Sequence, residues 1–199
     1  INLTKVKIDN QYLRALSYQL YENNGVLKRK NIDDIIKLIS KEERKKLWYM
    51  GIKIGRYHVF LPKMLKPKAV MLRTMLWKIH NNILTELDIP KFGLNFVVND
   101  NFNEKYLLLC GFERFKDYFI RIDILEKLFI SIIDTTVDRK FKISPEMMNL
   151  LGCTKENFLK LMNFMNYKKS KDSDTYYFSS DIKKNKDKVA LNKNKISPF

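Results

Sequence analysis

The residues with the most evident chemistry lie in one stretch, 51–80. It holds seven basic side chains and no acidic one, with aromatic and apolar residues between the charges. Cations of this kind replace the counterions condensed on a phosphate backbone, and aromatic rings stack on bases. The stretch therefore predicts a surface that binds a nucleic acid. A basic face that contacts only solvent is the alternative interpretation.

Ten residues are the candidates for contact with a nucleic acid. Most belong to the basic stretch, and two belong to a later predicted helix, where they lie away from its apolar stripe. The set is Lys53, Arg56, Tyr57, His58, Lys63, Lys66, Lys68, Arg73, Lys155 and Lys160. For His58, a partly buried and hydrogen-bonded position in the core is the competing interpretation.

No catalytic, cofactor or metal motif accompanies these residues. The glycines of 51–56 lack the spacing and the Lys-Ser/Thr pair of a phosphate-binding loop. Cys110 and Cys153 lie far apart, and neither CxxC nor HExxH occurs, which argues against a zinc site. The adjacent acids at 33–34 and 42–43 fall early in predicted helices, where carboxylates favour the helix dipole. We therefore expect no catalytic residue, bound cofactor or metal in this chain.

Composition indicates a globular protein with an anionic partner. Hydrophobic residues make up 45% and charged residues 30% of the 199 residues, and the net charge is +16. Residues 41–80 alone carry eleven basic and two acidic side chains. A nucleic acid fits this excess better than an acidic membrane surface. No apolar run approaches the ~18 residues of a membrane span, and two isolated cysteines are typical of a reducing, cytoplasmic location.

Periodicity and capping signals predict helices in the first half. We expect helices over 12–24 and 32–39, and a third that Ser40 and Glu43 open as a capping box. Residues 52–61 are strand-like, with Gly55 as a break. Pro67 begins a helix through residue 79, whose apolar face is Ala69, Leu72, Leu76 and Ile79.

The second half predicts a winged-helix order. Asp123 and Glu126 form a second N-terminal box, opening a helix with Leu125, Leu128, Phe129, Ile132 and Ile133 directed inward. Helices follow from Ser144-Pro145 to a stop at Gly152, and over 155–165 with Thr154 as its cap. Strands over 167–169 and 175–178 flank a polar turn.

These elements predict a mainly α fold, α+β overall. We expect a helical lobe over 1–87, a winged-helix-like lobe with a small β-hairpin over 88–180, and a disordered basic tail over 181–199. Residues 87–102 are interpreted as a connection between the lobes. Because the sequence opens with Ile1, we expect it to be part of a longer protein.

Several segments together resemble a known family. The most specific is 51–67, with the pattern G-x-x-x-G-x-x-x-V-F-L-P-x-x-L-K-P. Others are 14–20 (RALSYQL), 24–27 (NGVL), 42–44 (EER), 111–112 (GF), 121–126 (RIDILE), 151–152 (LG) and 197–199 (SPF). In this order they resemble the C-terminal part of alphaproteobacterial DExH-type RNA helicases, which are similar to the mitochondrial degradosome RNA helicase.

The resemblance implies a parent enzyme with two RecA-like motor domains upstream that bind ATP and magnesium. None of the motor motifs lies in this chain, so no nucleotide-binding residue carries over. The implied role is an RNA-binding accessory region that holds a single strand for the motor. Two rivals stay open: a stand-alone nucleic-acid-binding protein, and a module that docks another subunit such as an exonuclease.

Overall fold

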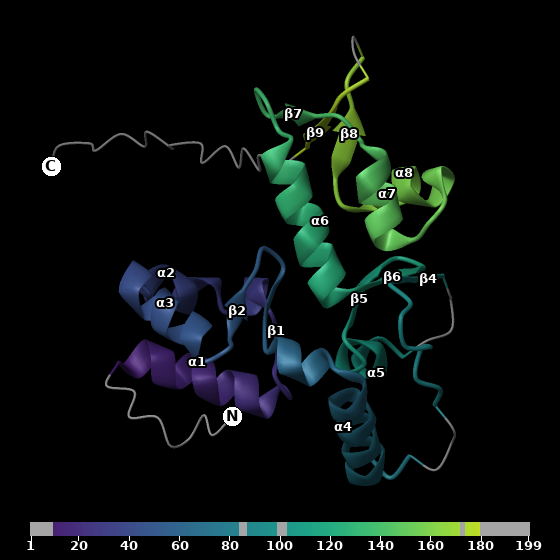
Figure 1. Cartoon of the computed structure of the whole chain (residues 1–199). Helices are drawn as coiled ribbons and strands as arrows, with labels where there is room; N and C mark the ends of the chain where they lie inside the picture. The colour runs from purple at the N-terminus through teal and green to yellow at the C-terminus, as the bar shows by residue number, and fades with distance from the viewer. Residues whose placement is uncertain (1–9, 84–86, 99–102, 172–173, 180–199) are drawn as a thin grey trace, which may run out of the picture.

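Helices and three small antiparallel sheets make up the fold (Figure 1). The computed structural model describes residues 10–83, 87–98, 103–171 and 174–179. The helices are α1 (Gln11–Glu22), α2 (Asp33–Leu38), α3 (Lys41–Tyr49), α4 (Pro67–His80), α5 (Glu104–Leu109), α6 (Ile122–Asp134), α7 (Pro145–Leu151) and α8 (Lys155–Phe164), with 3-10 turns at Arg29–Asn31 and Pro62–Leu65.

The first sheet lies beside helices α1 to α3. Its strands are β1 (Val26–Lys28), β2 (Lys53–Ile54) and β3 (His58–Phe60), in the order β1-β3-β2. The predicted capping box is confirmed at the start of α3. The Glu43 amide donates to the Ser40 hydroxyl over 3.3 Å, and the Ser40 amide donates to the Glu43 carboxylate over 2.8 Å.

The second sheet has the order β4-β6-β5 and packs with α4 and α5. Its strands are β4 (Phe96–Val98), β5 (Phe112–Phe115) and β6 (Tyr118–Arg121). The sequence signals did not indicate these strands, and part of 87–102, expected to be a plain connection, is strand β4. The helix at 67–80 is confirmed, but its apolar face is not the buried one. Val70, Arg73 and Thr74 point inward instead.

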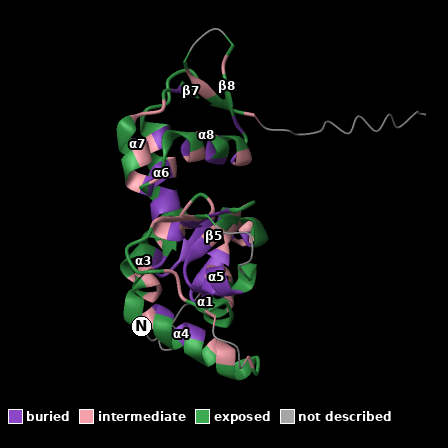
Figure 2. Cartoon of the chain, turned by 90° about the vertical axis from the view of Figure 1, so that its right-hand side faces the viewer, coloured by how far each residue is buried: buried purple, intermediate pink, exposed green. Residues whose placement is uncertain are grey.

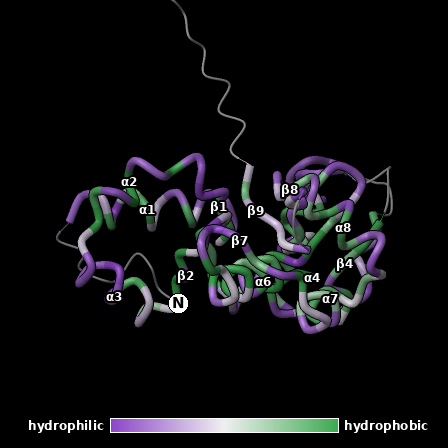
Figure 3. Tube along the Cα trace, turned by 90° about the horizontal axis from the view of Figure 1, so that it is seen from above, coloured by the Kyte–Doolittle hydropathy of each residue, from purple (hydrophilic) through white to green (hydrophobic). Residues whose placement is uncertain are grey.

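Helix α6 follows β6 without an intervening residue and rises to the third unit (Figures 1 and 2). It is a largely hydrophobic segment in the view of Figure 3. The predicted N-terminal box is wrong here. Asp123 accepts from the Arg121 guanidinium, and the Glu126 side chain accepts from the loop between β2 and β3. Ile133, expected to point inward, is 53% exposed.

The third unit follows the order α6, β7 (Lys140–Phe141), α7, α8, β8 (Tyr167–Lys169) and β9 (Tyr176–Phe178). Its sheet has the order β7-β9-β8. The predicted helix stop is confirmed, because Gly152 is left-handed with φ 67°. Thr154 caps α8 through the Asn157 amide, as predicted.

The fold class is thus a mixture of helix and strand with small sheets. Four buried clusters form its core, the largest around α6, α7 and α8. In the part of the chain that the structure describes, no helix is both long and apolar enough to cross a bilayer. The predicted basic tail lies outside the described residues.

Candidate nucleic-acid interface

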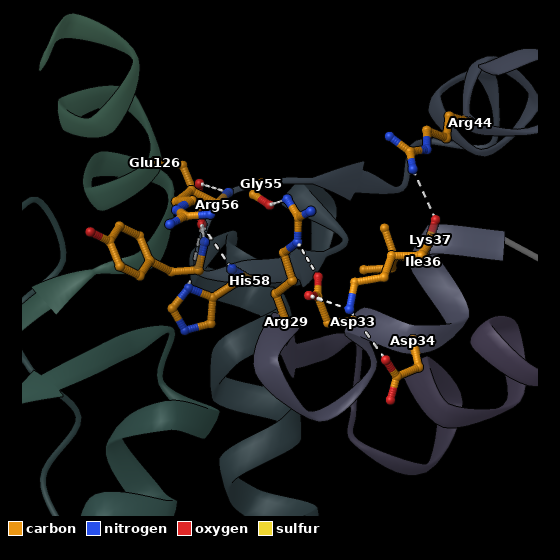
Figure 4. A network of polar contacts seen from close by, with 11 residues as sticks. Arg29, Asp33, Asp34, Ile36, Lys37, Arg44, Gly55, Arg56, His58 and Glu126 are labelled. Atoms are coloured by element: carbon orange, nitrogen blue, oxygen red, sulfur yellow. Dashed lines mark hydrogen bonds and ion pairs between the residues drawn. The ribbon is translucent and has the colours of Figure 1, made fainter. Parts of the chain in front are cut away.

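A buried carboxylate joins α6 to the loop between β2 and β3. Glu126 accepts the backbone N–H groups of Arg56, Tyr57 and His58 over 2.6, 2.8 and 2.9 Å (Figure 4). Burial raises the pKa of Glu126, but hydrogen bonds from His58 and from these amides outweigh it and hold the pKa below its usual range. The loop that carries the predicted site is therefore fixed on α6.

His58 lies inside this junction rather than on the surface. Its Nε2 is 2.9 Å from Glu113, its Nδ1 is 3.6 Å from Glu126, and the residue is fully buried. Glu113 also pairs with Lys28 over 2.8 Å. Burial alone would lower the pKa of His58, yet its two carboxylate neighbours raise it. The core interpretation of His58 therefore fits its position, and the imidazole does not face a ligand.

Arg73 is the second predicted residue that is buried. Its guanidinium donates to the carbonyl of Asn24 and to the carbonyl of Leu109, each over 2.7 Å. Burial lowers the pKa of Arg73 to about 10. The side chain ties α4 to the segment after α1 and to the end of α5, and it is not available to a phosphate.

The remaining predicted residues are exposed or half-buried but do not lie together. Lys63, Lys66 and Lys68 lie on the 3-10 turn at Pro62–Leu65 and the start of α4. Lys155 and Lys160 lie on α8, where Lys160 pairs with Glu156 over 2.7 Å. Lys53, Arg56 and Tyr57 lie beside α6, where they line two hollows.

One hollow of about 650 Å³ is lined mainly by aromatic rings. It lies between α6 and the β7-β9-β8 sheet. Tyr57 of the β2–β3 loop, Phe129 of α6 and Phe164 of α8 line it, together with Tyr177 and Phe178 of β9. Tyr177 is 38% and Phe178 50% exposed, so both residues leave surface that a ligand can contact.

A second hollow, of about 660 Å³, lies on the other side of Arg56. Trp48, Lys53 and Lys127 line it, with Ile130 of α6. The two hollows share Arg56, Phe129 and Ile133. The Arg56 guanidinium is 5.6 Å from the centroid of the Phe129 ring, a cation–π geometry. We call the two hollows together the α6 groove.

The α6 groove has a positive character. Its cations are Arg29, which pairs with Asp33 over 3.1 Å, and Lys53, Arg56, Lys127 and Arg139, which have no carboxylate partner among the described residues. Its two acids are occupied, since Asp123 pairs with Arg121 and Glu126 is held by the β2–β3 loop. Sequence reasoning missed Lys127, Arg139 and Phe129, because they lie far along the chain from the basic stretch. The aromatic residues at 176–178 were the one available signal.

No protein-family model, no curated protein and no solved structure matches the chain. Within the described residues, no three His, Cys, Asp or Glu side chains gather as a metal site.

Proposed function

We propose that this chain binds single-stranded RNA in the α6 groove. The observation that carries the proposal is the position of Arg56, which joins an aromatic hollow to a cationic one. A strand along the groove would meet charge for its phosphates from Lys53, Arg56 and Lys127. It would meet rings for its bases from Tyr177 and Phe178. Backbone charge and sequence-tolerant stacking are the two contributions that single-strand binders combine.

The resemblance to DExH-type RNA helicases implies a biological role for this RNA binding. In that setting the chain is the C-terminal accessory region, and RecA-like motor domains upstream bind ATP and magnesium. The α6 groove holds the strand between motor cycles, so that the cycles become directional movement. The order α6-β7-α7-α8-β8-β9 supports a winged-helix lobe, which the order of the predicted helices and strands led us to expect. A GxxxxGK[ST] motif encoded upstream of Ile1 is the test of this setting.

The binding test compares two single strands of equal length, a uridine oligomer and the same backbone without bases. Fluorescence anisotropy of the 199-residue chain gives both affinities. Stacking is worth about 1–3 kcal/mol per base, so we expect the baseless strand to bind more weakly. Replacing Tyr177 and Phe178 by Ala should reduce this difference.

A matched control uses two exposed aromatic residues of α1, Tyr18→Ala with Tyr21→Ala, which should leave the difference unchanged. Equal affinity for the two strands would remove stacking from the proposal while leaving binding by charge. Failure of the wild-type chain to bind either strand at low salt would overturn the function itself.

A further inference from the structure

The outward face of α4 is apolar and uncovered in the described residues. Its large side chains are Met71, Leu72, Met75, Leu76 and Ile79, which are between 54% and 62% exposed. They form two adjacent rows spaced by four residues, 71-75-79 and 72-76. Monomeric soluble proteins rarely expose contiguous apolar surface of this kind unless a partner covers it.

The helix cannot roll to bury this face. Val70, Arg73, Thr74 and Trp77 occupy the inner side, and Val70 packs with Tyr106 of α5. The buried Arg73 guanidinium is held by two carbonyls, those of Asn24 and Leu109. Turning α4 about its axis would leave that charge without partners in the interior, which costs several kcal/mol. The face is therefore fixed toward the outside.

The shape of the surface suits a helix. A hollow of about 500 Å³ runs along α4, and Ile89 lines it together with Met71, Met75 and Ile79. Rows spaced by four residues form ridges, and an apolar helix packs its own ridges into the grooves beside them. Methionine adapts to such a partner because its side chain is unbranched and flexible.

The positive charges around the face favour a negatively charged partner. Helix α4 contains no acidic residue, and Lys66 and Lys68 lie at its start. Lys78 lines the hollow, with its ammonium 2.8 Å from the carbonyl of Leu87. Two copies of this helix would bring like charges together, which disfavours self-association. A partner helix with acidic residues beside its apolar stripe complements the basic residues around the α4 face.

We propose that the outward face of α4 binds an amphipathic, acidic α-helix of another protein. This inference stands apart from RNA binding, because α4 shares no residue with the α6 groove. It assigns the chain a second surface, through which a partner is held while the groove stays open.

The test uses two labelled peptides of about 20 residues, long enough to form a helix. Both have Leu at i, i+3, i+4 and i+7; one has Glu and the other Lys at most remaining positions. Anisotropy should show the Glu peptide binding about tenfold more tightly than the Lys peptide. Leu72→Gln with Met75→Gln should weaken the Glu peptide about tenfold, because central apolar side chains dominate the energy of such interfaces.

The control variant is Leu38→Gln with Val137→Gln, two exposed apolar residues elsewhere, which should bind as the wild type does. Ile79→Gln alone gives an independent measure of the same face, and circular dichroism melting checks that each variant is folded. Equal binding of the two peptides would overturn the proposal. So would binding to vesicles with one part anionic lipid in about four while neither peptide binds, or dimerisation that the double variant abolishes.

Discussion

The carboxylate of Glu126 occupies the space in which a side chain on Gly55 would lie. A Cβ built on Gly55 would come within 2.3 Å of that carboxylate. The same carboxylate accepts three consecutive amides of the β2–β3 loop. Gly55 is thus required by a close approach across the chain rather than by its own backbone angles.

Gly55→Ala should destabilise the protein by about 1–3 kcal/mol, the usual cost of forcing atoms into a packed interior. Urea unfolding measures the change. In a Glu126→Ala background the same substitution should cost less, because the group it displaces is gone. An equal cost in both backgrounds would show that the strain has another source.

The His58 junction should give the protein greatest stability in weakly acidic solution. The pKa of His58 in the folded protein is raised above the ordinary 6.5. The stability that protonated His58 contributes is therefore fully present below pH 6.5 and is lost as the pH rises through the folded pKa. The pKa values of Glu113 and Glu126 lie below the ordinary 4.5, so their contribution is present above pH 4.5 and is lost as the pH falls. Urea unfolding from about pH 4 to about pH 8 measures both limbs.

The control for this pH dependence is His58→Gln, which removes the titrating imidazole. The variant should lose the decline on the alkaline side and keep a smaller decline on the acidic side, because Lys28 and the loop amides still hold the pKa values of Glu113 and Glu126 down. A wild-type curve that stays flat above pH 6.5, or a variant curve parallel to it, would show that His58 does not titrate with folding.

Two charge-matched triple variants should separate the α6 groove from the rest of the basic surface. Lys53, Arg56 and Lys127 changed to Ala should reduce RNA affinity more than Lys63, Lys66 and Lys68 changed to Ala. The salt dependence of log affinity should also fall, by about 0.7 for each phosphate that is no longer neutralised. Because both variants remove three positive charges, equal effects would mean that only total charge governs binding.

Gly152→Val should lower stability by about 1 kcal/mol, because a branched residue resists the left-handed conformation. Open space surrounds the position, so no clash adds to this cost. Lys160→Ala should change stability by no more than about 0.5 kcal/mol, since its ion pair with Glu156 is exposed. Thermal melts of the two variants, with Gly152→Asn as a milder control, test the order.

Local signals predicted the local structure well. The Ser40–Glu43 box, the Thr154 cap and the stop at Gly152 depend on residues within one turn of each other. Helix α4 shows where such reasoning fails. Apolar side chains lie on most of its circumference, so periodicity did not identify the inner face. Arg73 points inward because two carbonyls distant in the chain accept hydrogen bonds from its guanidinium.

The candidate site was predicted only in part for the same reason. Lys53, Arg56 and Tyr57 lie in the α6 groove, but His58 and Arg73 lie in the core, where their partners come from far along the chain. Glu126 matched the spacing of a helix box and instead binds amides 68 to 70 residues away. The pairing of β4 with β6 likewise joins segments far apart in the chain, whereas β5 and β6 form a hairpin across Lys116 and Asp117, a local pattern that sequence reasoning missed.

Helix α6 connects three parts of the fold rigidly. Its first turn continues β6, its second turn is pinned at Glu126, and its remainder packs against α7. Because three amides share one pinning carboxylate, tilting the helix would break these bonds together rather than singly. A force on the third unit would therefore meet a stiff connection until all three hydrogen bonds of Glu126 break in one step.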